Sequence, residues 1–251
     1  MDILPNEILA LILNYVSDVS CGFARVSKRF NSLFIIIKEE RIKDEKECFE
    51  QFTPLVIFTS YERIKIFKKA CRLGKKCVIN SMISKGVEDW NWGMINAAEG
   101  GHKNWVEFFI LKGANKWDWG MINAALGGHK DLVDFFILKG ANDWNWGIYG
   151  AAEGGHKDLV YFFIEKGAND WNGGMLNAAK GGHKDLVELF IEKGANNLNK
   201  GMCNAAYGGH KELVEFFIEK GANDWNDGMS YAAAGGHKEL VDFFKAKQHS
   251  R

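Results

Sequence analysis

The sequence has little proline and no paired cysteines, and both shortages restrict its class. Two prolines stand against 28 glycines, so the repeats must use glycine alone for their turns. The five cysteines are odd in number and include no Cys-x-x-Cys pair: Cys21, Cys48, Cys71, Cys77 and Cys203. This usage predicts reduced thiols in a reducing compartment.

The sequence also lacks an excess of charge of either sign and any long apolar run. Lys+Arg and Asp+Glu both total 32, whereas a nucleic-acid binder needs a surplus of positive charge that faces phosphates. The longest apolar runs, such as Ile8 to Leu13, are too short to span a bilayer, and the first residues lack the basic and apolar regions of a signal peptide. We therefore expect no nucleic-acid partner, no membrane association and a cytoplasmic location.

What the sequence does contain is a cassette that recurs every 27 residues. Each copy has an Ala-Ala-x-Gly-Gly-His-Lys frame, followed by an apolar run and by Lys-Gly-Ala-Asn or a remnant of it. The frame histidines are His102, His129, His156, His183, His210 and His237. A fixed period in this range predicts a solenoid, in which each unit buries its apolar face only against its neighbours.

Each unit predicts two short helices. In the copy that begins at Trp119, Met121 and the Ala124-Ala125 pair form a small-residue face, and Gly127-Gly128 ends the first helix. A second helix then opens at His129 and Gly140 stops it. Its apolar stripe has helical spacing and consists of Val133, Phe136 and Ile137.

This unit resembles an ankyrin repeat. The shared frame is Ala-Ala-x-x-Gly-His, then a Val-x-x-Phe-Ile type stripe and Gly-Ala-x-x-Asn, but ankyrin repeats have about 33 residues and Thr-Pro-Leu-His. Here the unit has 27 residues, and Trp-Gly-Met-Ile stands where Thr-Pro-Leu-His would be. The missing residues are those of the projecting β-hairpin finger. The resemblance therefore implies an all-α helix-pair solenoid that lacks these fingers.

The chain divides into three predicted parts. Residues 1–53 are not repetitive and indicate a small helical domain, residues 54–91 form a degenerate capping repeat, and residues 92–251 hold six 27-residue repeats. The N-terminal pattern Leu-Pro-x-Glu-Ile-Leu-x-x-Ile-Leu, followed by Val-Ser-Lys-Arg-Phe, resembles an F-box. That resemblance implies a surface for a Skp-type adaptor of a cullin-RING ligase, formed by Leu4, Pro5, Ile8, Leu9, Ile12 and Leu13.

Two departures qualify the F-box resemblance. The loop between its helices is about one residue short, and Ser27 replaces the usual Cys. The alternative is an ordinary helical cap for the solenoid. Shortened repeats behind an F-box are similar to proteins of large DNA viruses of protists, which would place this chain in the host cytoplasm.

The repeated histidines do not indicate chemistry. Helix layers lie roughly 8–10 Å apart, whereas zinc holds imidazole nitrogens at about 2.0–2.1 Å. We expect each His to bond the backbone at its own helix start and so tie one unit to the next. No nucleophile lies in an identifiable motif beside a His, and no carboxylate pair stands apart from the charged helical faces. We expect no enzyme activity, no cofactor and no metal.

Three positions on the first helix change from repeat to repeat while the core Phe stays constant. Such change on a constant scaffold indicates where a partner is recognised, and aromatic residues make good binding anchors. The alternative is neutral drift at solvent-facing positions. The predicted target-binding residues are Trp92, Ile95, Glu99, Trp119, Leu126, Trp146, Tyr149, Glu153, Lys180 and Tyr207.

A second tryptophan series is more regular. It recurs every 27 residues, except at one position where Leu198 takes its place: Trp90, Trp117, Trp144, Trp171 and Trp225. Its regularity predicts a structural role, in which each ring covers the end of the helix-pair core that the absent fingers would leave open.

Two functions remain from the sequence. The first is a monomeric adaptor that recruits a target protein to an SCF-type ubiquitin ligase through its F-box-like residues. The second is a scaffold that binds and sequesters a host protein without a ligase. The target itself cannot be identified from the residues.

Overall fold

The structure, a computed structural model, describes residues 60–249. Every regular element in that range is an α-helix, and the range contains no strand. This confirms the predicted all-α class and the helix-pair solenoid for these residues. The chain divides into two compact units at residues 115 and 116, which are described separately. The F-box-like segment and its predicted adaptor-binding residues lie outside the described range.

The described part of unit 1 contains two helix pairs. They are α4 (Ser60–Arg72) with α5 (Lys76–Ser84), and α6 (Trp90–Glu99) with α7 (Lys103–Leu111). Helix α4 packs against both α5 and α6, and α6 packs against α7. At the centre, the rings of Phe67 and Phe109 meet edge to face with centroids 5.7 Å apart, and both are fully buried.

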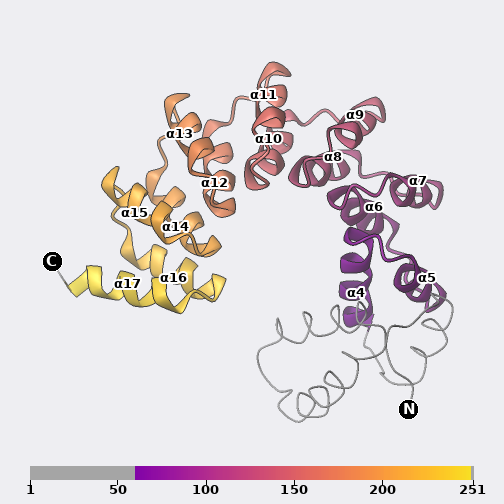
Figure 1. Cartoon of the computed structure of the whole chain (residues 1–251), viewed down its shortest axis with the longest axis horizontal. Coiled ribbons are helices and arrows are strands. Elements are labelled where there is room, and N and C mark those ends of the chain that lie inside the picture. Colours follow the sequence, from indigo (N-terminus) through magenta and orange to yellow (C-terminus); the bar gives the residue numbers. More distant parts are fainter. Residues whose placement is uncertain (1–59, 250–251) are drawn as a thin grey trace, which may run out of the picture. The chain divides into compact units, whose positions relative to one another are not determined.

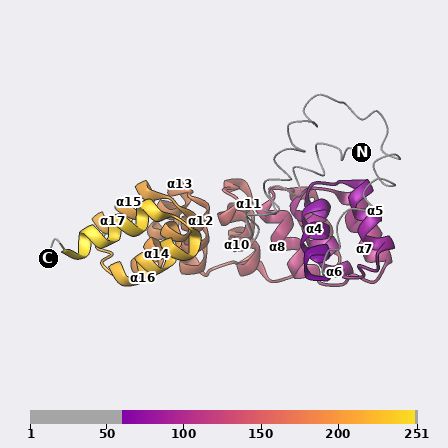
Figure 2. The ribbon, with the colours of Figure 1, turned by 90° about the horizontal axis from the view of Figure 1, so that it is seen from below.

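Unit 2 contains five further helix pairs. They are α8 (Trp117–Leu126) with α9 (Lys130–Leu138), α10 (Trp144–Glu153) with α11 (Lys157–Glu165), α12 (Trp171–Gly181) with α13 (Lys184–Glu192), α14 (Leu198–Gly208) with α15 (Lys211–Glu219), and α16 (Trp225–Gly235) with α17 (Lys238–His249). First helices of successive pairs pack against one another, and each second helix packs against its own first helix. Unit 2 therefore has two layers (Figure 1), and α17 lies at its C-terminal end (Figure 2).

In unit 2, glycine ends every helix except α17 in the same way. After α8, Gly128 has a φ of +78°, and the His129 N–H bonds back to the Ala124 carbonyl at 2.8 Å. After α9, Gly140 has a φ of +110°, and the Ala141 N–H bonds to the Phe136 carbonyl at 3.0 Å. Both are Schellman closures, which need a residue that tolerates a positive φ. The predicted helix ends are confirmed, and the short 139–143 connection leaves no room for a finger.

One phenylalanine per repeat forms the core, and a glycine on the first helix makes room for it. Phe136, Phe163, Phe190, Phe217 and Phe244 are all fully buried. A Cβ at Gly147 would lie 2.4 Å from Cε1 of Phe163, so any larger residue there would displace the ring. The same close approach recurs at Gly120, Gly174, Gly201 and Gly228. Trp-x-x-Gly in the sequence is thus a packing motif.

The tryptophans that begin the first helices pack onto this core. Trp225 is half-buried, and its ring lies 6.5 Å from that of Phe244 in unit 2. In unit 1, Trp90 stacks on Phe109 at 6.4 Å with an interplanar angle of 24°. These contacts agree with the expected structural role. Because the rings keep part of their surface in water, removing one costs less than the roughly 3–5 kcal/mol of a fully buried aromatic.

Candidate functional site

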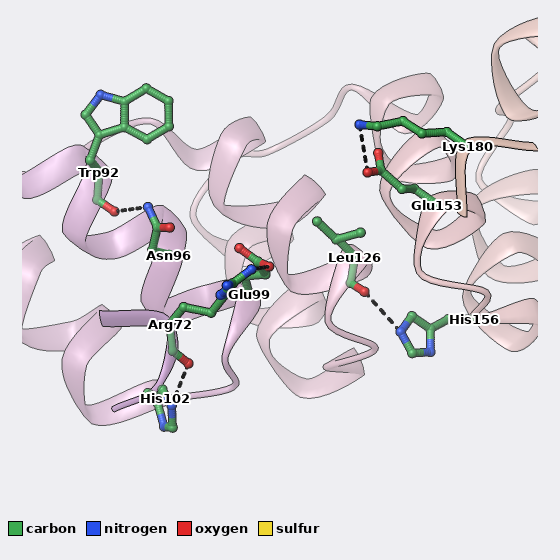
Figure 3. A network of polar contacts seen from close by, with 9 residues as sticks. All are labelled: Arg72, Trp92, Asn96, Glu99, His102, Leu126, Glu153, His156 and Lys180. Atoms are coloured by element: carbon green, nitrogen blue, oxygen red, sulfur yellow. Dashed lines mark hydrogen bonds and ion pairs between the residues drawn. The ribbon is translucent and has the colours of Figure 1, made fainter. Parts of the chain in front are cut away.

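The repeated histidines join successive repeats. In unit 2, Nε2 of His156 lies 3.0 Å from the Leu126 carbonyl oxygen, and His183, His210 and His237 make the same bond to Glu153, Lys180 and Tyr207. His102 does so with Arg72 in unit 1 (Figure 3). A carbonyl only accepts, so Nε2 carries the proton. The expected bond at the histidine's own helix start is wrong, because these side chains make no cap there. The expected tie between units is correct.

The glycines before these histidines leave the space that the histidine bonds need. A Cβ at Gly154 would lie 2.2 Å from the Leu126 carbonyl oxygen, which accepts the bond from His156. A Cβ at Gly155 would lie 2.4 Å from the ring of His183 in the next repeat. Gly-Gly-His is therefore an interlock between repeats. The described residues contain no group of three or more His, Cys, Asp or Glu that could hold a metal ion.

A second inter-repeat contact was not predicted. Asn145, the second residue of α10, accepts through Oδ1 from the backbone N–H groups of Asn169 and Asp170, at 2.9 and 3.0 Å. The same pair of bonds recurs in unit 2 at Asp118, Asn172 and Asn199. The signal was present in the sequence, since Asn or Asp follows the first residue of every one of these helices.

The large exposed aromatic side chains on the first helices of unit 2 are Trp119, Trp146, Tyr207 and Tyr231. Trp119 on α8 and Trp146 on α10 are 44% and 42% exposed. Their rings meet edge to face, with centroids 5.1 Å apart and an interplanar angle of 73°. Large exposed aromatics in contact form the kind of surface that anchors a binding partner.

In unit 1 the corresponding tryptophan is already occupied. Trp92 is 39% exposed, and the ammonium of Lys68 lies 3.4 Å from its ring centroid. Burial lowers the pKa of Lys68 below its usual value, and the Asp89 carboxylate partly offsets that effect. In this fold a tryptophan at this repeat position therefore accepts a cation on its face.

Tyr149, on α10, extends the aromatic surface towards the start of α12. Its hydroxyl donates a hydrogen bond to Oδ2 of Asp170. Burial raises its pKa above the usual range, and the bond to Asp170 adds to the effect. The ring occupies the space in front of Gly173, where a Cβ would lie 2.3 Å from Cε1 of Tyr149. Gly173 stands at the repeat position of Trp119 and Trp146, and with Tyr149 in place this position has no space for a larger side chain.

The predicted residues at the end of the first helices pair with one another. Lys180 makes an ion pair with Glu153 at 2.8 Å in unit 2, and Arg72 does so with Glu99 at 3.0 Å in unit 1 (Figure 3). Such partly exposed pairs contribute roughly 0–1 kcal/mol. At the equivalent position of other repeats, Leu126 is half-buried and Tyr207 is exposed.

The third predicted column lies deeper in the fold. Ile95 is 5% exposed, and its side chain belongs to the packing of unit 1. At the corresponding positions in unit 2, Cys203 is also buried, whereas Tyr149 keeps part of its surface in water. The predicted residues with the most accessible side chains are therefore the three tryptophans and Tyr207.

The architecture defines a repeat solenoid of the kind that presents an extended surface to proteins. Residues 148–228 match the family model for ankyrin repeats in three copies, which supports the ankyrin-like character of the shortened helix pairs in this segment and a role in protein–protein interaction. The crystal structure of the human ASB11 ankyrin repeat domain is similar at 19% identity and a TM-score of 0.38, covering 62% of this chain and 84% of that chain. No curated protein matches significantly.

Proposed function

We propose that this chain recruits a target protein to a ubiquitin ligase without catalysing a reaction itself. The repeats would hold the target, and the F-box-like residues Leu4 to Leu13 would bind a Skp-type adaptor. The observation that carries the target-binding half is the exposed and contacting pair of Trp119 and Trp146 on neighbouring helices. No helix of the described range is long and apolar enough to cross a membrane.

The scaffold supports this division of labour. The histidine and asparagine bonds hold successive repeats in a fixed register, so the first helices of unit 2 can present a preformed surface. A preformed surface binds with a smaller loss of conformational entropy than a flexible one. The adaptor half is supported by the sequence resemblance to an F-box alone.

Co-purification of the full chain with a Skp-type adaptor tests the adaptor half. We expect the wild-type chain to bind and an Ile8→Asp/Leu9→Asp double variant to lose binding. The matched control is Leu111→Asp/Leu138→Asp, because these leucines are 86% and 87% exposed and the same change there places two new charges on the repeat surface. The control should bind as the wild type does.

Two results would contradict the adaptor half. One is a folded wild-type chain that retains no adaptor. The chain would then be a scaffold that sequesters its target, and the N-terminal residues would serve only to cap the solenoid. The other is equal loss in the test and control variants, which would reflect added charge and not a specific surface.

A further inference from the structure

We infer that the Trp119–Trp146 pair in unit 2 is a subsite for a Lys or Arg side chain of a basic protein segment. The inference rests on the proposed target-binding role and specifies the chemistry of the target. It does not depend on the adaptor half. Three observations carry it: the occupied tryptophan in unit 1, the side chain that replaces the occupying lysine in unit 2, and the carboxylates around the pair.

Unit 1 shows how a tryptophan at this position is used. Lys68 precedes Trp92 by 24 residues and places its ammonium over the ring. The residue 24 positions before Trp146 is Ile122, on α8. An isoleucine provides no cation, and within the described residues of unit 2 no lysine or arginine is recorded over the ring of Trp119 or Trp146. The exposed surface of these two rings therefore carries no cation from the described part of unit 2, unlike that of Trp92 in unit 1.

Carboxylates lie beside the exposed rings. Asp118 precedes Trp119 and accepts a bond from the backbone N–H of Asp143 at 3.1 Å. Asp143 and Asp170 both act electrostatically on Tyr149, so the three carboxylates follow one edge of the aromatic surface. Among the first helices α8, α10 and α12 and the loops before them in unit 2, Lys180 is paired with Glu153, and Lys139 and Lys166 lie over the rings of Phe135 and Phe162 on the preceding second helices. Lys116 comes directly before α8. Asp118, Asp143 and Asp170, at the starts of these three helices, favour a cationic ligand.

The subsite is confined to one part of unit 2. The same repeat position holds Gly173 on α12, Lys200 on α14 and Asp227 on α16. None of these offers an aromatic face, and Lys200 would repel a cation. A basic side chain would thus be recognised at α8 and α10, with the aliphatic part of Lys or Arg on the rings and its charge towards the carboxylates.

A peptide selection with the full chain tests this. The probe is a library of ten-residue peptides with randomised sequence, applied to the wild type, to Trp146→Ala and to Tyr207→Ala. Tyr207 is similarly exposed but lies on α14. We expect enrichment of Lys or Arg at one position with the wild type and with Tyr207→Ala, and none with Trp146→Ala. For a selected peptide, Trp146→Ala should weaken binding about 5- to 30-fold, the range for a partly desolvated cation–π contact.

Three further variants isolate charge and occupancy. Asp143→Asn keeps a side chain that can cap α10, since Asn caps as well as Asp, but removes a negative charge. It should weaken the same peptide while leaving the unfolding temperature unchanged. Ile122→Lys should place an ammonium over Trp146, as Lys68 does over Trp92, and so block the peptide, whereas Ile122→Met should not.

Several results would overturn the inference. They are selection of acidic or purely apolar peptides, a basic preference that survives Trp146→Ala, a library without any binder for the folded wild type, or full binding by Ile122→Lys. None of these bears on co-purification with a Skp-type adaptor. Failure of the subsite and failure of the adaptor role are therefore distinguishable.

Discussion

Gly155→Ala should destabilise unit 2 more than the same change at Gly167, although both glycines close a helix in the same repeat. Gly155 has a φ of +76° and Gly167 a φ of +105°, so both changes impose backbone strain of roughly 1–2 kcal/mol. They differ in space. A Cβ at Gly155 would lie 2.4 Å from Cε1 and 2.6 Å from Nδ1 of His183, whereas nothing lies within 4 Å of one at Gly167.

The clash adds an overpacking penalty of roughly 1–3 kcal/mol at Gly155 only. The expected loss of unfolding free energy is therefore about 2–5 kcal/mol for Gly155→Ala and about 1–2 kcal/mol for Gly167→Ala. Urea unfolding followed by circular dichroism measures both. Because the two sites belong to one repeat, their comparison is less affected by stepwise unfolding of the array.

A double-mutant cycle assigns the difference to the histidine ring. His183→Ala alone loses the bond to the Glu153 carbonyl and should cost about 1 kcal/mol. Combined with Gly155→Ala it also removes the clash, so the two losses should sum to more than the double variant shows. Combined with Gly167→Ala the losses should add. Equal losses at the two glycines, together with additivity in both cycles, would refute the interlock.

Three further predictions follow from the contacts in unit 2. Asn145→Ala leaves two backbone N–H groups without their acceptor and should lower the unfolding free energy by about 1–3 kcal/mol, whereas Asn145→Asp should be tolerated because Asp118 makes the same bonds; thermal unfolding that ranks the two equally would contradict this. Burial raises the pKa of Cys203 to about 12, so at pH 8 its thiolate fraction is about a thousand times smaller than that of an unperturbed thiol. In a variant that retains only this cysteine, thiol-reagent labelling should be slow until urea unfolds the chain, and equally fast labelling before unfolding would contradict its burial. Glu153→Gln should cost less than about 1 kcal/mol, since the ion pair with Lys180 is partly exposed, and a larger loss in urea unfolding would show a stronger role for the pair.

Local features of this fold follow from the sequence, and contacts between repeats follow only in part. Gly128 and Gly140 predict the helix ends because a positive φ is a property of one residue and its immediate neighbours. The acceptor for His156 is a carbonyl 30 residues away, and a periodic sequence does not specify which backbone group faces which side chain across a stacking interface. The tie between units could be predicted, but its geometry could not.

The candidate site illustrates a second limit. When equivalent positions of the repeats are compared one position at a time, Gly173 looks like drift away from Trp119 and Trp146. The structure links the change to Tyr149, which stands in a different column of the preceding repeat and fills the space that a tryptophan would need. Ile95 is the opposite case. Most of the equivalent residues of the other repeats differ from it, but its side chain is only 5% exposed, so packing constrains this position.

The joint between Tyr149 and Gly173 also bears on how a chain of near-identical repeats finds its register during folding. Most interfaces in unit 2 use the same histidine and asparagine bonds, so a helix pair that docked one repeat too far along would satisfy nearly all of them. Tyr149 removes that freedom. A slip of one repeat would bring it against Lys200 instead of Gly173, and the ring would have no space. The Tyr149–Gly173 pair, which differs from the other repeats, thus favours the correct order of α10 and α12. It disfavours the misaligned, aggregation-prone arrangements to which repeat proteins are susceptible.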